Sequence, residues 1–147
     1  MIKKQLFEAC QSYVLKRENT VKEIISSNQK ALHSETKSSA GDKHETGRAM
    51  LQLEMEKAGQ QLAVIDQMKM ILDRVLINDT SEIIKLGSLV FTNKHNYFLA
   101  ISAGEFKIEN KAYYAVSVAS PIGKMLLGKK EGDAFEFNGN VVIEKVV

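Results

Sequence analysis

The chain has 147 residues, of which 44% are hydrophobic and 26% are charged, and its formal net charge is +2. This composition is that of an ordinary globular protein of one or two domains, and it excludes a wholly disordered chain. No apolar run approaches the roughly 20 residues that cross a bilayer, and the net charge is too small to indicate a protein that wraps nucleic acid.

The first residues, Met1-Ile2-Lys3-Lys4-Gln5, lack the hydrophobic segment of a signal peptide. We therefore expect a cytoplasmic protein that does not associate with membranes. The chain has one cysteine, Cys10, which cannot form an internal disulfide and cannot by itself build a thiolate metal site. A zinc centre is not expected.

Residues 1–77 contain no proline and only three glycines, and their apolar residues follow helical spacing. The first part is irregular: a seam of Ile2, Leu6, Ala9 and Tyr13 precedes a shifted one of Cys10, Val14, Val21, Ile24 and Ala31. In the second part, the apolar residues are spaced by alternating steps of four and three, as in a coiled-coil seam. The seam has one polar member, Lys69, and consists of Leu51, Met55, Ala58, Leu62, Ile65, Lys69, Leu72 and Leu76.

Two long helices are therefore predicted, each of about 35 residues or roughly 50 Å. The small residues of Ser38-Ser39-Ala40-Gly41 break the pattern between them and favour a reversal of the chain. We predict an antiparallel coiled-coil hairpin over residues 1–77, with its tip near residues 38–46.

Two carboxylates, Asp42 and Glu45, stand at this tip, three residues apart. The spacing is that of a helix N-cap with its capping-box partner, which stabilises a helix by about 0.5 to 2 kcal/mol. Carboxylates at the far end of two long helices also suggest a function that is exerted at a distance. The spacing alone favours the cap, and the two roles are compatible.

After Asn78-Asp79 the pattern changes to short β-branched and aromatic runs bounded by Gly, Asn and Asp. Five strands are predicted, at residues 88–92, 97–101, 113–118, 134–137 and 141–146. Asn138-Gly139 predicts a tight hairpin between the last two. Pro121 and Gly128 bracket one short helix, so residues 78–147 are expected to form a small sheet with one helix against it.

The run from Ser120 to Asp133, SPIGKMLLGKKEGD, closely resembles the C-terminal signature of the bacterial Gre transcript cleavage factors. The tip is similar as well, because these factors place Gly-Asp-x-x-Glu at the start of their second long helix, and here Gly41-Asp42-Lys43-His44-Glu45 stands there. The order of parts also agrees, so the resemblance covers essentially the whole chain. It implies an α+β protein with an N-terminal antiparallel coiled-coil hairpin and a small FKBP-like antiparallel β domain.

The resemblance also implies a mechanism. Gre factors bind RNA polymerase through the globular domain and pass the coiled coil down the secondary channel. By that analogy Asp42 and Glu45 would hold a Mg²⁺ shared with the polymerase, which then cuts backtracked RNA near its 3′ end. No stably bound cofactor or small-molecule ligand and no independent enzymatic activity are expected. The polymerase contact would lie in the signature segment, at Ser120, Pro121, Ile122, Lys124, Leu127, Lys129 and Lys130.

The tip departs from the family after the glutamate. Gre tips usually continue with Asn-Ala-Glu-Tyr, whereas this chain has Thr46-Gly47-Arg48-Ala49, with one acid and one aromatic residue fewer. The basic residues Lys43, His44 and Arg48 would either weaken Mg²⁺ binding or contact RNA phosphates or the channel; as a third interpretation, they are simply solvated.

Two other functions stay open on the sequence. One is a non-cleaving modulator or inhibitor of RNA polymerase with the Gre fold. The other is a coiled-coil interaction module unrelated to transcription. A prolyl isomerase, which the FKBP-like fold also supports, lacks a tryptophan and an evident aromatic pocket here.

Overall fold

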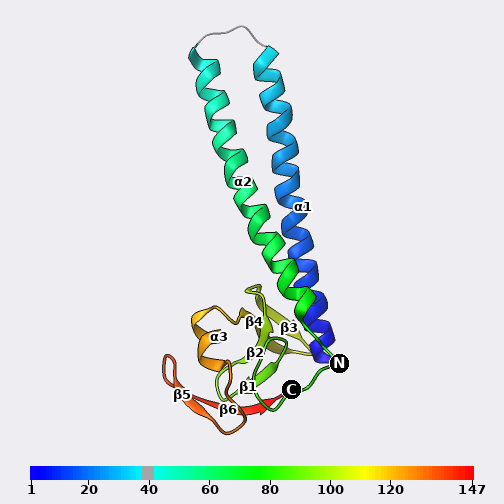
Figure 1. Ribbon diagram of the computed structural model, residues 1–147, viewed down its shortest axis with the longest axis vertical. Helices are drawn as coiled ribbons and strands as arrows, with labels where there is room; N and C mark the ends of the chain where they lie inside the picture. The colour runs from blue at the N-terminus through cyan, green and yellow to red at the C-terminus, as the bar shows by residue number, and fades with distance from the viewer. Residues whose placement is uncertain (38–41) are drawn as a thin grey trace. The chain divides into compact units, whose positions relative to one another are not determined.

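The computed structural model describes the main chain of residues 1–37 and 42–147, and the side chains of residues 1–34 and 47–147. The protein is α+β, with two long helices followed by a six-stranded sheet and one short helix (Figure 1). Its contacts divide it into two compact units: residues 14–68, and residues 1–13 together with 69–147.

The two predicted long helices are present. α1 spans Ile2–Lys37 and α2 spans Asp42–Arg74, so α2 ends three residues before the expected boundary at residue 77. The turn predicted at residues 38–41 lies outside the described residues. Both helices form because neither contains proline, and α1 has no glycine.

In the unit 14–68, the two helical segments lie side by side and run in opposite directions (Figure 1). Most of the predicted α2 seam is confirmed as the less exposed side, since Ala58 and Ile65 are buried and Leu51, Met55 and Leu62 are partly buried. Its later members Lys69 and Leu76 are exposed, so the prediction fails there. Asn28 of α1 donates a hydrogen bond from Nδ2 to Oε2 of Glu54 in α2, at 3.1 Å. The knobs-into-holes packing of a coiled coil stays a prediction.

The stripe predicted on α1 is only partly correct. Val14 and Val21 are buried as expected, but Ile24 is 42% exposed. The buried positions also include Glu18 and Asn28. From Val14 through Glu18 and Val21 to Asn28 the successive steps are four, three and seven residues, which keep these positions on one helix face. Polar side chains therefore occupy positions where the hydrophobic pattern sought only apolar ones.

The other unit contains the sheet, whose strand order is β3-β4-β2-β1-β6-β5. The five predicted strands are confirmed as β1 (Leu89–Thr92), β2 (Asn96–Ala100), β4 (Lys111–Ser117), β5 (Ala134–Glu136) and β6 (Asn140–Val146). β5 and β6 pair antiparallel, and the predicted hairpin between them has positive φ at Asn138 and Gly139.

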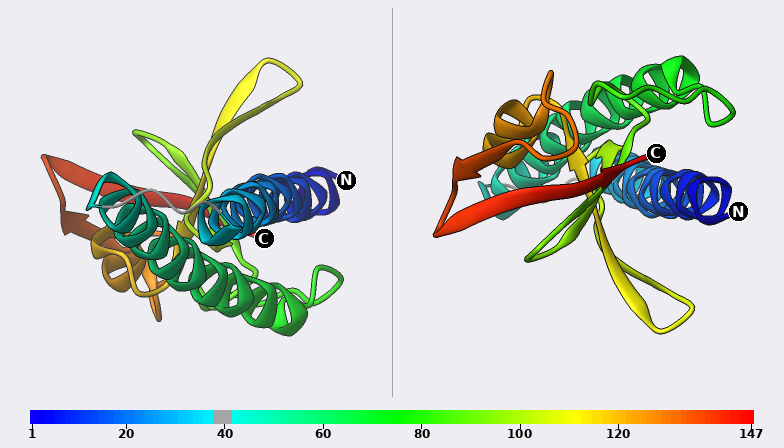
Figure 2. Two further views of the ribbon diagram at one scale, coloured as in Figure 1. Left: turned by 90° about the horizontal axis from the view of Figure 1, so that it is seen from above. Right: turned by 90° about the horizontal axis from the view of Figure 1, so that it is seen from below.

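Two features of the sheet were not predicted. β3 (Gly104–Ile108) is an additional strand, paired antiparallel with β4, and their hairpin (yellow) projects from the rest of the sheet (Figure 2). The sheet is also mixed rather than antiparallel throughout, because β2 and β4 pair in parallel. Parallel neighbours need a crossover connection, and the chain makes it through β3.

One face of the sheet packs against α3 (Pro121–Leu126) and forms the main core. This core combines Ile122 and Leu126 of α3 with Ile84, which precedes β1, and with residues of β1, β2, β5 and β6. The strand residues are Val90, Tyr97, Leu99, Phe135, Val141 and Ile143. The opposite face carries the buried side chains of Leu89, Phe98, Tyr113 and Ala115, and the register pairs Phe98 with both Leu89 and Ala115. Buried Leu6, Cys10, Leu72 and Val75 come from the helix ends of the same unit.

Candidate functional site

The first predicted site is the start of α2. The helix begins at Asp42, so the main chain of both Asp42 and Glu45 lies in its first turn. The side chains of Asp42, Lys43, His44 and Glu45 lie outside the described residues, and both the capping and the metal interpretation stay predictions. Arg48 is described and is exposed, one turn beyond His44.

The second predicted site, residues 120–133, is described in full, and its first residue is explained by local structure. Ser120 is the N-cap of α3: its Oγ accepts a hydrogen bond from Gly123 N at 3.1 Å and donates one to the Ser117 carbonyl at 2.6 Å. Pro121 occupies the first helical turn, where its missing N–H costs nothing. The Ser-Pro pair thus starts the helix.

The apolar and glycine positions of the segment are also structural. Ile122 was predicted to shape a contact surface, but this is wrong, because its side chain is 8% exposed and belongs to the core with Leu126. Gly128 has a φ of +84°, a conformation that side chains disfavour, so the short helix stops there. Asp133 then closes the next turn by accepting a hydrogen bond from Lys130 N at 2.9 Å.

The charged and exposed residues of the segment differ in their freedom. Lys129 donates a hydrogen bond to the Met125 carbonyl, and its ammonium group lies 5.2 Å from the centre of the Phe135 ring. It is therefore held against its own domain. Lys124 and Lys130 are exposed, and so is Leu127, at 45%. Of the residues predicted to contact a partner, these three and Pro121 are exposed.

Sequence reasoning missed a second segment that lies against this one. Ile84 N donates to the Lys129 carbonyl at 2.8 Å, and Gly128 N donates to the Ile84 carbonyl at 2.9 Å. Ile84 is buried, whereas Ile83 forms a bridge with Lys130 and is 47% exposed. An exposed apolar residue paired with Lys130 is the signal that could have indicated a docking surface. We call Ile83, Leu127, Lys124 and Lys130 the α3 patch.

An open pocket of about 420 Å³ adjoins this surface. Glu82, Lys130, Glu131, Gly132 and Val146 line it. Charges of both signs thus lie next to exposed Ile83, which pairs with Lys130, as at the polar rim of an interface.

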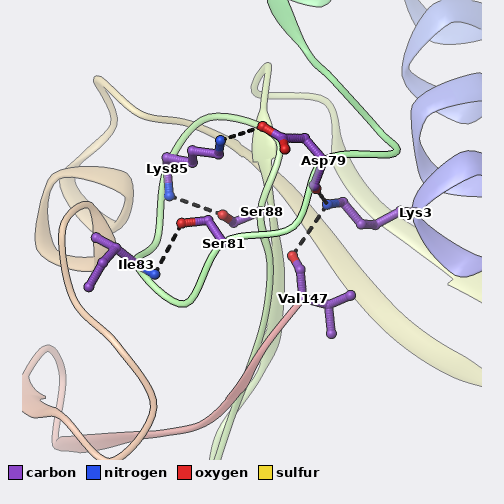
Figure 3. Close-up of polar contacts among 7 residues, drawn as sticks. All are labelled: Lys3, Asp79, Ser81, Ile83, Lys85, Ser88 and Val147. Atoms are coloured by element: carbon purple, nitrogen blue, oxygen red, sulfur yellow. Dashed lines mark hydrogen bonds and ion pairs between the residues drawn. The ribbon is translucent and has the colours of Figure 1, made fainter.

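A polar cluster fixes the segment that carries Ile83 (Figure 3). Lys3 is only 5% exposed, and its Nζ donates to the main-chain oxygens of Asp79 and Val147, at 3.0 and 3.3 Å. The Asp79 carboxylate is 2.6 Å from Nζ of Lys85. Ser81 and Ser88 accept hydrogen bonds from the main-chain nitrogens of Ile83 and Lys85. The segment 79–88 is therefore tied to α1 and to the end of β6.

Burial and charge in this cluster shift the pKa values of Lys3 and Asp79. Burial lowers the pKa of Lys3, and nearby Lys85 lowers it further, while Asp79 acts in the opposite direction. The hydrogen bond and charge of Lys85 lower the pKa of Asp79. The arrangement keeps Asp79 ionised, and its contacts are those of a structural tie rather than of a reactive centre.

Within the part of the chain whose side chains are described, no three His, Cys, Asp or Glu residues come together as a metal site. In the same part, no helix combines the length and apolar character that crossing a membrane requires. The sequence matches no protein-family model, and a search of curated proteins finds no significant match.

Proposed function

We propose that the protein is a Gre-like transcription elongation factor that binds RNA polymerase in the cytoplasm. In this proposal residues 1–77 form an antiparallel coiled-coil hairpin that enters the secondary channel, and residues 78–147 form an FKBP-like domain that docks outside it. Asp42 and Glu45 hold a Mg²⁺ ion jointly with the polymerase, which supplies the nuclease chemistry for cutting backtracked RNA.

The observation that carries the proposal is the start of α2 at Asp42. Both acids belong to the first turn of a 33-residue helix, which at 1.5 Å per residue is roughly 50 Å long. A carboxylate pair at the first turn of so long a helix suits delivery of charge to a distant site. An enzyme with its own active site would instead be expected to place its catalytic acids in a cleft.

The α3 patch supports the docking half of the proposal. Three of its residues belong to the segment that resembles the Gre signature, and the fourth, Ile83, pairs with Lys130 from outside that segment. Large apolar side chains with charges of both signs nearby fit a partner surface that has an apolar centre and a charged rim. Ser120 and Ile122, in contrast, stabilise α3, because Ser120 caps the helix and Ile122 packs in the core.

A non-cleaving modulator of RNA polymerase is the second candidate. It is favoured by Arg48, an exposed cation less than one turn from Glu45, at a tip that has one acid fewer than the Gre pattern. A cation near the pair lowers its affinity for Mg²⁺ by like-charge repulsion. Such a protein would occupy the channel and alter elongation without promoting cleavage.

Binding separates these two candidates from an interaction module unrelated to transcription. Bacterial RNA polymerase core enzyme, immobilised on a biosensor, should bind the full chain, and a known Gre factor should compete for the same site. Absence of binding would sink both polymerase-directed functions. Binding that a Gre factor does not displace would contradict the shared channel.

A further inference from the structure

The sheet carries a second open pocket, of about 530 Å³, that the proposed function does not use. Its lining includes Phe91, Lys94, Lys111, Glu144 and Lys145. Three lysines against one glutamate leave a net charge of two positive at this place. We call it the lysine pocket.

The register explains how residues from four strands reach the same place. Phe91 pairs with Lys145 on one side and with Asn96 on the other, and Asn96 pairs with Tyr113 of β4. The β1–β6 register shifts between Phe91 and Thr92. Such a bulge re-aims a side chain, and here it sets Lys145, rather than its neighbour Glu144, opposite Phe91.

The cations of the lysine pocket come from three separate elements. Lys145 belongs to β6 and Lys111 begins β4, and neither has an ion-pair partner among the residues whose side chains are described. Lys94, in the turn between β1 and β2, donates from Nζ to the Asn138 carbonyl at 2.7 Å. Like charges gathered around one pocket favour an anionic ligand.

An aromatic ring lies among these cations. Phe91 is partly buried, and its ring is held by a T-shaped contact with buried Tyr113, with centroids 6.2 Å apart. His95 also lines the pocket and is exposed, but its ring contacts Tyr114, which packs against the main core, edge-on at 5.1 Å. A fixed ring surrounded by lysines is the combination on which single-stranded nucleic acids stack and neutralise their phosphates.

From this geometry we propose that the lysine pocket binds single-stranded RNA. Lys111 and Lys145 stand on β4 and β6, which are three strand spacings apart, or roughly 14 Å. Cations spread over that main-chain distance suit a strand that carries several phosphates. The pocket is distinct from the tip and from the α3 patch.

The test measures anisotropy of a fluorescent oligouridylate with the full chain. Two or three phosphate contacts predict that affinity falls about 7- to 18-fold between about 50 and 200 mM salt. Lys111→Glu with Lys145→Glu should weaken binding at least about tenfold and flatten the salt dependence. Phe91→Leu should weaken it about fivefold or more through lost stacking, with a thermal melt showing that the variant is folded.

The matched control is Lys16→Glu with Lys30→Glu, which changes the net charge equally at two exposed lysines of α1. It should bind RNA as the unmodified chain does. The proposal is overturned if the unmodified chain binds no RNA at low salt, or if the two charge reversals weaken binding equally. It is also overturned if Lys43→Ala with Arg48→Ala abolishes binding while the pocket variant retains it, or if polyglutamate competes as well as RNA.

Discussion

A β-carbon placed on Gly123 would lie 2.0 Å from the main-chain oxygen of Ser117. That oxygen accepts hydrogen bonds from both the nitrogen and the hydroxyl of Ser120, so it cannot move without loss of the α3 cap. The glycine of the Ser-Pro-Ile-Gly sequence is therefore required by close approach of two main-chain segments.

Gly123→Ala should lower the free energy of unfolding by about 1 to 3 kcal/mol or more, because the main chain must shift. Gly59→Ala is the matched control: Gly59 lies within α2, and no atom is within 4 Å of its added β-carbon. It should raise stability by up to about 1 kcal/mol through helix propensity. Urea unfolding of both variants measures the difference, and a neutral Gly123→Ala would contradict the close contact.

Tyr113→Phe should leave stability unchanged or raise it by up to about 1 kcal/mol. The Tyr113 side chain is fully buried, and its hydroxyl has no hydrogen-bond partner among the described residues. Burial and the charge of Glu109 both raise the pKa of this hydroxyl. Removing an unpaired buried polar group removes its desolvation cost. A loss of more than about 1 kcal/mol in urea unfolding would instead indicate a bound partner such as an ordered water.

Stability should fall in alkaline solution because of Cys10. Burial raises the pKa of its thiol from 9.0 to about 12, so the unfolded chain releases this proton before the folded one does. The contribution is fully present below pH 9 and is lost as pH rises toward 12; by about pH 10.5 the loss is up to about 2 kcal/mol. Cys10→Ala should show a flatter decline between pH 8 and 10.5 in urea unfolding. Parallel curves for the two proteins would contradict the buried thiol.

Charge placed on the α3 patch should weaken polymerase binding. Ile83→Asp with Leu127→Asp puts carboxylates at two apolar positions that are 47% and 45% exposed, and loss of an apolar anchor typically costs more than about 1 kcal/mol of binding, or at least about fivefold in affinity. Leu76→Asp is the control, since Leu76 is 65% exposed in the same unit but lies outside the patch. Equal effects in the biosensor measurement would place the contact elsewhere.

Local pattern was enough to predict the long helices and five of the strands. Their signals are strong because burial on one face imposes a period on the sequence. β3 was missed because its residues are mostly exposed, and an edge strand with few buried positions leaves little alternation. The hydrogen bond between buried Asn28 and exposed Glu54 could not be predicted either, since it joins residues far apart in sequence.

The candidate sites show the same division. Pro121 and Gly128 correctly indicated the ends of α3, because backbone constraints act locally. Ile122 was misassigned to a surface, since an apolar residue in a short helix gives no sign of which side faces the sheet. Ile83 joins Lys130 only through pairing between distant segments, and the cations of the lysine pocket come together only through the sheet order.

Transcript cleavage tests the proposed function most directly. Stalled, backtracked elongation complexes of bacterial RNA polymerase should release short 3′ RNA fragments when the protein and Mg²⁺ are added. Asp42→Ala with Glu45→Ala should abolish this release while binding to the polymerase is retained. If the unmodified protein binds the complexes and releases no RNA, or if the double variant cleaves as well as the unmodified protein, the role proposed for the two carboxylates is wrong.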